Sequence, residues 1–290
     1  MTIISSAIPI VETVRDVGGR YRVWFVDIWG VMHNGRNAFA RAAAATRAFR
    51  ADGGIVVLLS NSPRPSPDVR EQLRQFGVPD EAYDATVTSG DLTRHELAKH
   101  DGAKVFHLGP ERDRAIFDRL NVTLAGPEDG ELIVCSGLFD DDVETPEDYG
   151  DLLRGLAAKG PTMLCANPDH MVERGHRLVY CAGALAAVYE TLGGEVIYAG
   201  KPHAPVYELA LETAAQIAGE TVEKAQVLAI GDGLRTDIAG ARGFGLDAIF
   251  VASGLHAPGE GGEALDVAHL AELFGEETRL PIAAMRALHW

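Results

Sequence analysis

The sequence is poor in positive charge. Its 26 Lys and Arg residues stand against 42 Asp and Glu residues, and the formal net charge is -16 at pH 7. A nucleic-acid interface needs a surplus of positive field to replace the counterions of the phosphate backbone, so nucleic acid is not expected as a partner. An anionic substrate must therefore be held by a local arrangement of donors or by a metal ion.

Cysteines and long apolar runs are also scarce. The three cysteines, Cys135, Cys165 and Cys181, lie among apolar or small residues without metal-like spacing, which argues against a disulfide framework or a zinc site. Residues 1–14 have no basic lead, and their longest apolar run is too short for a signal peptide or a membrane span. We therefore predict a cytoplasmic protein that is neither exported nor bound to a membrane.

What the sequence does contain is a regular alternation of strand and helix patterns. Short runs rich in β-branched residues, at 23–26, 55–59 and 226–230, are typical of strands buried on both faces, as in parallel sheets. Amphipathic segments at 38–51, 66–76 and 206–219 read as helices between them. This alternation with short connections predicts an α/β fold with a Rossmann-like parallel sheet covered by helices.

The pattern changes between residues 92 and 194. Strands such as 104–108 and 132–135 still alternate with helical stretches, but the acidic run 139–144 interrupts them and reads as a solvated loop. We interpret 92–194 as a second α/β domain inserted into the first. The predicted core then comprises residues 1–91 and 195–290.

Four predicted strands end in residues that can do chemistry. These residues are Asp27, the pair Ser60 and Asn61, Lys201, and Asp232 with nearby Asp237. The carboxyl ends of parallel strands share one edge of a sheet, where ligands bind in open α/β folds, so these side chains can converge in one crevice. Asp27 taken alone has a simpler interpretation, because Asp also favours turns after strands.

The chemistry of these residues is consistent. Two or three carboxylates form the oxygen-only site that Mg²⁺ prefers. A hydroxyl, an amide and an ammonium group can bind the oxygens of a phosphoryl group and neutralise its developing charge. Asp27 is then the natural nucleophile, since an aspartyl-phosphate divides one difficult displacement into two easier ones.

The order and spacing of these motifs resemble the haloacid dehalogenase (HAD) superfamily. They are most similar to its class IIA, the NagD-like sugar and nucleotide phosphatases, which carry a large α/β cap of the C2 type between the second and third motifs. The most specific element is the fourth motif, Gly231-Asp232-x-x-x-Thr236-Asp237-Ile238, whereas Gly-Lys-Pro at 200–202 alone is weak. The resemblance covers nearly the whole chain. It implies a Mg²⁺-dependent hydrolase that acts on a small phosphomonoester, a sugar phosphate or nucleotide monophosphate.

The same resemblance implies roles for individual residues. Asp27 is the phosphoryl acceptor and Lys201 is the catalytic cation of the third motif. The phosphate is bound by Ser60, Asn61 and Ser62, with Asn167 in a cap loop at 166–169 that faces the substrate. Mg²⁺ is held by Asp27, the backbone carbonyl of Trp29 and Asp232, with Asp237 in support. The expected partner is a small phosphorylated metabolite, and the resemblance also allows a homodimer.

One position departs from the family pattern. The family usually carries Asp-x-Asp, whose second Asp protonates the leaving oxygen and then activates water, but this chain has Trp29 there. An indole cannot shuttle a proton at neutral pH, and loss of a positioned acid and base typically costs about 10²–10⁴-fold in rate.

Three interpretations of Trp29 stay open. In the first, His33 takes over the proton transfer, because it is the nearest group that titrates near neutral pH. Against this, His33 can also be a turn residue without a catalytic role. In the second, the leaving group of the substrate needs little protonation. Or the protein is a catalytically weakened or non-enzymatic phosphate-ligand binding or regulatory protein. The remaining motifs are intact, which favours an enzyme. Arg64, in the loop of the second motif, either meets a substrate anion or pairs with a surface carboxylate.

Overall fold

The computed structural model describes residues 8–174, 177–252, 265–275 and 279–290. The chain divides into two compact units. The first unit comprises residues 1–59, 73–85 and 210–290, and the second comprises residues 60–72 and 86–209. The predicted insertion, 92–194, falls within the second unit. The exact core and cap boundaries expected from the sequence stay a prediction.

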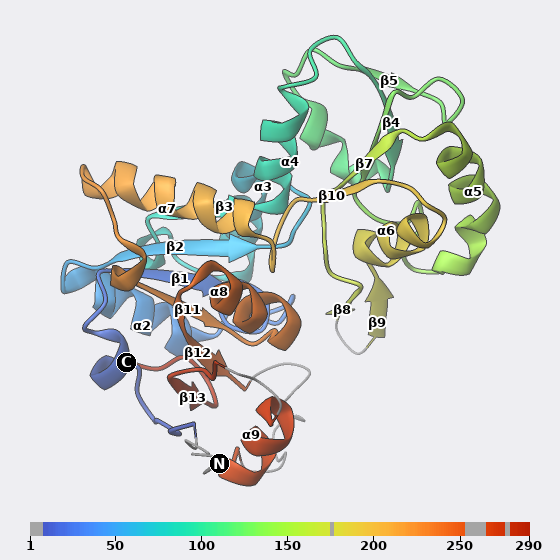
Figure 1. Ribbon diagram of the computed structural model, residues 1–290. Helices are drawn as coiled ribbons and strands as arrows, with labels where there is room; N and C mark the ends of the chain where they lie inside the picture. The colour runs from blue at the N-terminus through green and yellow to red at the C-terminus, as the bar shows by residue number, and fades with distance from the viewer. Residues whose placement is uncertain (1–7, 175–176, 253–264, 276–278) are drawn as a thin grey trace. The chain divides into compact units, whose positions relative to one another are not determined.

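The first unit is built on a six-stranded sheet with the order β13-β12-β11-β1-β2-β3, of whose edge strand β3 residues 86–88 are counted with the second unit (Figure 1). Its strands are β1 (Val23–Asp27), β2 (Ile55–Ser60), β3 (Ala85–Thr88), β11 (Val227–Gly231), β12 (Asp247–Val251) and β13 (Ala283–Met285). Strand β1 pairs in parallel with β2 and β11, and β11-β12 and β12-β13 are parallel as well. The predicted α/β fold with a Rossmann-like parallel sheet is confirmed.

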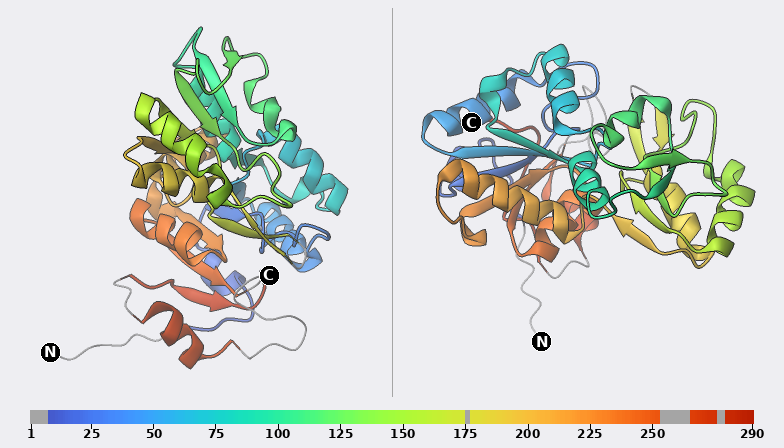
Figure 2. Two further views of the ribbon diagram at one scale, coloured as in Figure 1. Left: turned by 90° about the vertical axis from the view of Figure 1, so that its right-hand side faces the viewer. Right: turned by 90° about the horizontal axis from the view of Figure 1, so that it is seen from above.

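Helices and short helical turns connect these strands. They are α1 (Arg15–Gly18), α2 (Ala40–Ala51), α3 (Ser66–Phe76), η1 (Asp80–Ala82), α7 (Ala204–Ala218), η4 (Lys224–Gln226), η5 (Leu234–Ile238), α8 (Ala239–Phe244) and α9 (Val267–Phe274). The strand order runs outward from β1 in both directions, so right-handed crossovers place α2 and α8 on opposite faces of the sheet. The left view of Figure 2 shows blue and orange helices flanking the strands on opposite sides.

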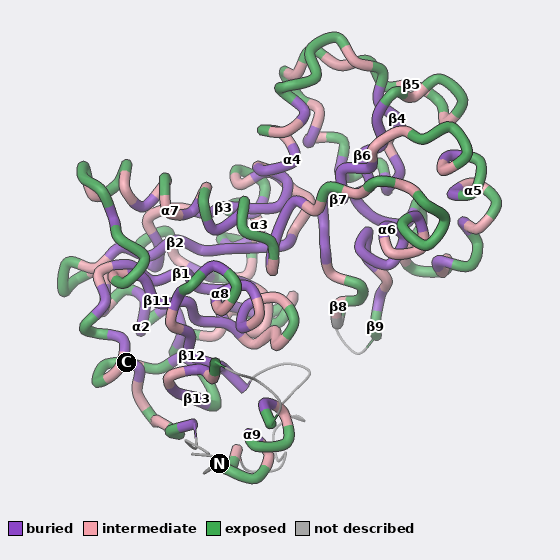
Figure 3. Tube along the Cα trace, viewed as in Figure 1, coloured by how far each residue is buried: buried purple, intermediate pink, exposed green. Residues whose placement is uncertain are grey.

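The core of the first unit surrounds β1. All five residues of β1 are buried, and so are all residues of β2 and β11 (Figure 3). Trp24 stacks on Phe49 of α2 with ring centroids 3.9 Å apart, and its Nε1 donates a hydrogen bond to the carbonyl of Gly18. A buried indole is stable there because its one polar group has a partner. The apolar run therefore forms a strand buried on both faces, as the sequence predicts.

The second unit has its own five-stranded parallel sheet in the order β10-β7-β6-β4-β5. Its strands are β4 (Lys104–Leu108), β5 (Thr123–Ala125), β6 (Leu132–Cys135), β7 (Thr162–Cys165) and β10 (Val196–Tyr198). Its helical elements are α4 (Ser89–Leu97), η2 (Glu111–Phe117), η3 (Pro146–Tyr149), α5 (Gly150–Lys159) and α6 (Ala182–Thr191). Strands β4 to β7 lie within the predicted insertion, 92–194, whereas β10 lies outside it, and the sheet has its own apolar core.

An antiparallel hairpin completes the second unit and was not expected from the sequence. It consists of β8 (Met171–Arg174) and β9 (Arg177–Tyr180). Arg174 of this hairpin forms ion pairs with Asp141 and Asp142 of the acidic run. That run is a loop, as expected, but its carboxylates are partly neutralised by arginines. The three cysteines are buried and free, and no described helix has the length and apolarity needed to cross a bilayer.

Candidate active site

Three carboxylates of the first unit lie together at the carboxyl edge of its sheet. One ligand oxygen from each of Asp27, Asp232 and Asp237 lies within 4.8 Å of the other two. Asp27 is the last residue of β1 and Asp232 is the first residue after β11, the strand that pairs with β1. Asp27 is 7% exposed and Asp237 is 6% exposed. Of the four strand ends expected to converge, those that carry Asp27 and Asp232 therefore lie together. The strand that precedes Lys201 is β10, which belongs to the sheet of the second unit, whereas the sequence had suggested the first sheet.

Gly30 makes room for Asp232 in this cluster. It has a φ of +79°, and a Cβ atom at this position would lie 1.9 Å from Oδ2 of Asp232. The backbone N–H of Gly30 donates to the carbonyl of His33, 2.9 Å away, which fixes the turn after β1. Only glycine satisfies both the left-handed backbone and the close approach of the carboxylate.

Asp237 is braced by the turn of the fourth motif. Its Oδ2 accepts hydrogen bonds from the backbone N–H of Gly233 at 3.1 Å and from the hydroxyl of Thr236 at 3.5 Å. A Cβ atom on Gly231 would lie 2.3 Å from the Cβ of Asp237. The π-helical turn η5 thus folds the Asp237 carboxylate back toward the end of β11.

Trp29 packs within the turn that follows β1. Its ring lies edge-on to the imidazole of His33, with centroids 5.0 Å apart at 72°. Gly35, at φ +80°, allows this packing, because a Cβ there would lie 2.6 Å from two atoms of the indole ring. The side chain of Trp29 therefore has a packing role in the turn, and metal binding by its backbone carbonyl stays a prediction from the family resemblance.

His33 is enclosed by the same turn. Its side chain is 1% exposed, and its Nδ1 accepts a hydrogen bond from the backbone N–H of Gly35 at 2.9 Å. Burial lowers the pKa of His33 to about 4, so the imidazole is neutral near pH 7. These contacts favour the interpretation of His33 as a turn residue over its interpretation as the proton shuttle.

In the second unit, Asn61 is joined to Lys201 across 140 residues of sequence. The Oδ1 of Asn61 accepts from the backbone N–H of Lys201 at 2.8 Å, and its Nδ2 donates to the carbonyl of the same residue at 3.0 Å. Nδ2 also donates to Asp169 at 2.8 Å, and Oδ1 accepts from the hydroxyl of Ser89 at 3.5 Å. An amide has two donors and two acceptor sites, so the side chain is fully engaged. The Asn61 side chain thus holds the backbone of Lys201 in position.

Lys201 itself is brought to this place by a close backbone approach. Gly200, at φ +153°, lies so near its neighbours that a Cβ would be 2.2 Å from the hydroxyl of Ser89 and 2.6 Å from Oδ1 of Asn61. Lys201 is 3% exposed and Asn61 is 6% exposed. The weak sequence signal Gly-Lys-Pro is thus part of a tightly packed arrangement, which explains why a glycine must precede the lysine.

Among the described hydrogen bonds, the hydroxyls of both serines of the second motif act as acceptors. Ser60, 3% exposed, accepts from the backbone N–H of Ser62 at 3.1 Å, and Ser62 accepts from the backbone N–H of Arg64 at 3.2 Å. Each hydroxyl is therefore an acceptor within the loop and retains its O–H as a donor. This arrangement fits the role of phosphate binding that the resemblance implies.

The loop 166–169 is held by Asn167 and Asp169. Asn167 is 8% exposed, and its Oδ1 accepts from the backbone N–H of Asp169 at 3.1 Å. Asp169 in turn accepts from Asn61, so the cap loop and the second motif are connected within the second unit. Sequence reasoning named Asn167 but missed Asp169 and Ser89 as partners of Asn61, since both contacts join residues far apart in the sequence.

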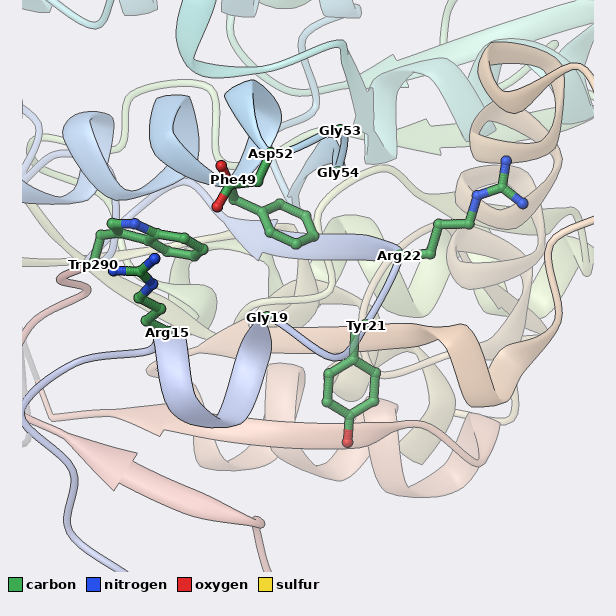
Figure 4. A pocket seen from close by; sticks show the side chains of 9 residues that line it. All are labelled: Arg15, Gly19, Tyr21, Arg22, Phe49, Asp52, Gly53, Gly54 and Trp290. Carbon is green, nitrogen blue, oxygen red and sulfur yellow. The ribbon is translucent and has the colours of Figure 1, made fainter.

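The first unit also has a cavity of about 410 Å³ at a different place (Figure 4). Nine residues line it: Arg15, Gly19, Tyr21, Arg22, Phe49, Asp52, Gly53, Gly54 and Trp290. Arg22 directly precedes β1 and Gly54 directly precedes β2, which places the cavity at the amino edge of the sheet. The carboxylate cluster lies at the opposite, carboxyl edge. The cavity is therefore separate from the candidate active site.

Comparisons with known proteins identify the family. The model of the haloacid dehalogenase-like hydrolase family matches residues 24–123, and a second HAD-hydrolase-like model matches residues 198–274. A solved hydrolase of the haloacid dehalogenase-like family from Brucella suis 1330 is 47% identical, with a TM-score of 0.86. The match covers 96% of this chain and all of that one. The chain belongs to the haloacid dehalogenase-like hydrolases.

Two curated relatives are more distant. The 5'-nucleotidase YutF of Bacillus subtilis is 24% identical over 240 residues, 81% of this chain and 88% of that protein. An acid sugar phosphatase of Staphylococcus aureus is 26% identical over 239 residues, with the same coverage of both chains. The predicted resemblance to the NagD-like class is confirmed in the fold. The prediction of a HAD-type hydrolase is confirmed as well.

Proposed function

We propose that this hydrolase is a Mg²⁺-dependent phosphatase that acts on a small phosphomonoester, a sugar phosphate or nucleotide monophosphate. The observation that carries the proposal is the cluster of three carboxylates with ligand oxygens within 4.8 Å of one another. The activities named for the Bacillus and Staphylococcus relatives support the predicted class of phosphoric monoester hydrolases.

The donor set of this cluster fits Mg²⁺. Asp27, Asp232 and Asp237 offer only oxygen atoms, and hard oxygen ligands with bound waters are what Mg²⁺ prefers. Three carboxylates this close repel one another, and a divalent cation relieves that repulsion. Asp27, Asp232 and the backbone carbonyl of Trp29 would hold the ion, with Asp237 in support. A bound Mg²⁺ would supply positive charge to the phosphoryl oxygens.

Asp27 is the nucleophile of the proposed reaction. Its carboxylate oxygen attacks phosphorus, the bond from phosphorus to the ester oxygen breaks, and an acyl phosphate forms on Asp27. Water then attacks this phosphorus, which releases inorganic phosphate and restores the carboxylate. Two protons move in this cycle, one to the leaving oxygen and one away from the water.

Lys201 and the hydroxyls of Ser60 and Ser62 are the proposed phosphate ligands. Lys201 is a buried ammonium group, and charge in a low-dielectric site interacts strongly with a phosphoryl group. Asn61 contributes by holding the backbone of Lys201 at both its N–H and its carbonyl. Direct contact of Asn61 and Asn167 with the phosphate stays a prediction from the family resemblance.

Trp29 keeps a second candidate function open. The indole of Trp29 cannot protonate the leaving oxygen, and the buried, neutral His33 is bound at Nδ1 to the turn. The alternative is a phosphate-ligand binding or regulatory protein with slow turnover or none. We propose the enzyme, because the nucleophile Asp27 lies with two further carboxylates in the first unit and Lys201 is buried in the second.

A substrate panel tests the proposal. We expect hydrolysis of p-nitrophenyl phosphate or of sugar and nucleotide monophosphates with Mg²⁺, and loss of this activity in Asp27→Asn. Equal activity of that variant contradicts the mechanism. Tight binding of panel compounds in calorimetry without turnover by the wild type selects the binding protein instead. The cytoplasmic location, the small-molecule partner without nucleic acid or membrane, and a homodimer remain proposals of ours.

A further inference from the structure

A buried carboxylate of the second unit has no role in the reaction proposed above. Asp113, on η2, is 3% exposed. Its Oδ1 lies 3.9 Å from Nε of Arg64. Burial raises the pKa of the Asp113 carboxyl, and the charge of Arg112, a hydrogen bond from Ser136 and the charge of Arg64 act against that rise. A carboxylate out of contact with water is stable as an ion only where cations and donors compensate the lost hydration.

Ser136 and His107 extend this contact into a chain of polar groups. Nε2 of His107 lies 2.9 Å from Oγ of Ser136. Burial lowers the pKa of His107 to about 4, so the imidazole is neutral near pH 7. A carboxylate can only accept, so the Ser136 hydroxyl donates to Asp113 and accepts from Nε2–H of His107. The chain therefore has one consistent order: His107, Ser136, Asp113, Arg64.

The order of the groups rules out a nucleophilic triad. A catalytic serine needs a histidine base oriented by a carboxylate, with the histidine in the middle. Here the serine stands in the middle, and its proton is committed to the carboxylate. The chain is therefore an anchor for Asp113.

Two parallel strands build this anchor. His107 lies on β4 and Ser136 directly follows β6, which pairs with β4, and the backbone N–H of Ser136 donates to the carbonyl of Leu108 at 2.9 Å. A Cβ atom on Gly109 would lie 2.0 Å from Oγ of Ser136. Glycine at 109 is thus required for the two side chains to meet. The backbone is arranged around the chain of polar groups.

The outer end of the chain is Arg64, in the loop of the second motif. Its backbone N–H donates to the hydroxyl of Ser62, one of the proposed phosphate ligands. The same loop is held by Gly90, whose N–H donates to the carbonyl of Ser62 and whose missing Cβ would lie 2.3 Å from the carbonyl oxygen of Pro63. The side chain of Arg64 is 35% exposed. A guanidinium anchored at its Nε side and accessible to solvent can bind a further anion with its other N–H groups.

From these contacts we propose that Arg64 is a specificity-determining residue that binds a second anionic group of the substrate, and that Asp113 positions it. The inference rests on the proposed phosphatase function. It narrows the substrate to phosphomonoesters that also carry a carboxylate or a second phosphate. The planar fork of Arg64 suits both groups, because each presents two oxygens to parallel N–H donors.

Matched substrate pairs test the proposal. 3-Phosphoglycerate and glycerol 3-phosphate differ by a carboxylate, and fructose 1,6-bisphosphate and fructose 6-phosphate differ by a phosphate. In at least one pair, we expect kcat/KM of the wild type to be about 10- to 100-fold higher for the substrate with the second anionic group. Arg64→Ala should lose this preference. Arg64→Lys keeps the positive charge without the paired N–H donors of the guanidinium, and should retain part of the preference. The pair that responds identifies the second group.

Asp113→Asn and Arg154→Ala complete the design. Asp113→Asn should raise KM for the favoured substrate and leave kcat/KM unchanged for its counterpart without the second anionic group, which a general loss of structure would not do. Arg154 is an exposed arginine paired with Asp151 on α5, and its replacement should leave the preference intact. A preference that is absent from the wild type, or that persists in Arg64→Ala, overturns the inference.

Binding separates this inference from the proposed reaction. If the wild type hydrolyses no substrate, the phosphatase proposal fails. Calorimetry with 3-phosphoglycerate and fructose 1,6-bisphosphate on Asp27→Asn, with and without Arg64→Ala, then decides the role of Arg64. A dissociation constant at least 10-fold larger in the double variant supports it, and equal constants or no binding overturn it.

Discussion

The side chain of Asn61 binds the backbone of Lys201 at both polar groups, with distances of 2.8 Å to the N–H and 3.0 Å to the carbonyl. The two residues are 140 positions apart in sequence. An amide is the side chain that can accept from one backbone group and donate to the other at the same time. The second and third motifs are therefore one structural element, and the position of the lysine depends on the asparagine.

Asn61→Ala should uncouple these motifs. The variant leaves both backbone groups of Lys201 without their partner, and a displaced catalytic group costs about 10²-fold in rate. We expect kcat/KM to fall by about that factor. Asn121→Ala is the control, because Asn121 is exposed and donates only to Asp101 among the bonds described. Activity of Asn61→Ala equal to that of the control contradicts the positioning role.

Gly30→Ala should disable the carboxylate cluster. The new Cβ would collide with Oδ2 of Asp232, so the carboxylate must leave its place near Asp27. We expect loss of most Mg²⁺-dependent activity and weaker Mg²⁺ binding in calorimetry, with a far-UV circular dichroism spectrum like that of the wild type.

Gly53→Ala is the matched control for this substitution. Gly53 has a φ of +91°, and a Cβ there meets nothing within 4 Å. Gly53→Ala therefore carries the strain of a left-handed alanine, about 1–2 kcal/mol, without a collision. Gly53→Ala should lose only the thermal stability that this strain costs, and only Gly30→Ala should lose activity. Equal activities of the two variants would show that Asp232 tolerates the displacement.

The strand ends were readable from the sequence because their signal is local. An apolar run followed by Asp27, or by Ser60 and Asn61, shows both the strand and the group that it delivers. Parallel pairing then brings distant ends to one edge without further information. The contact between Asp27 and Asp232 was predictable for this reason.

Other features were not readable because they depend on tertiary contacts. Nothing in the residues near Asn61 shows that its amide is saturated by Lys201 and Asp169. The β8-β9 hairpin is held in part by ion pairs between Arg174 and the acidic loop, which pair residues about 30 positions apart. The polar chain that ends at Asp113 needs the register of β4 against β6. Periodicity does not encode such pairings.

The buried imidazole of His107 predicts a pH dependence of stability. Its pKa falls from 6.5 to about 4 on folding, mainly through burial and further through nearby Arg114. The unfolded chain therefore binds the proton more readily than the folded protein. The contribution of the neutral His107 imidazole to the free energy of unfolding is complete above pH 6.5 and is lost as the pH falls toward 4.

His107→Gln isolates this contribution. The amide can still donate to Ser136, but it does not titrate. Between pH 7.5 and 4.5 the wild type should lose about 1–2 kcal/mol more stability in urea unfolding than the variant, a range reduced to allow for partial exposure. His33 is present in both proteins, so its own titration cancels in the comparison. Parallel pH profiles of the two proteins would show that His107 does not titrate in this range.

Trp29→Asp tests the missing proton donor through the leaving group. A p-nitrophenolate leaves readily without protonation, whereas the alkoxide of a sugar phosphate needs a proton in the transition state. The wild type should therefore favour p-nitrophenyl phosphate strongly over alkyl phosphates. Installing a carboxylate should raise kcat for alkyl phosphates by up to about 10²–10⁴-fold and change the rate for p-nitrophenyl phosphate little.

Trp29→Asn is the control, because it removes the same indole packing against His33 and Gly35 without supplying an acid. A gain of kcat in Trp29→Asp that is absent in Trp29→Asn shows that the native site lacks only the acid and base at this position. A loss of activity on both substrates in both variants would show that the indole is needed to keep the turn after β1, and with it the Trp29 carbonyl and Asp27, in place.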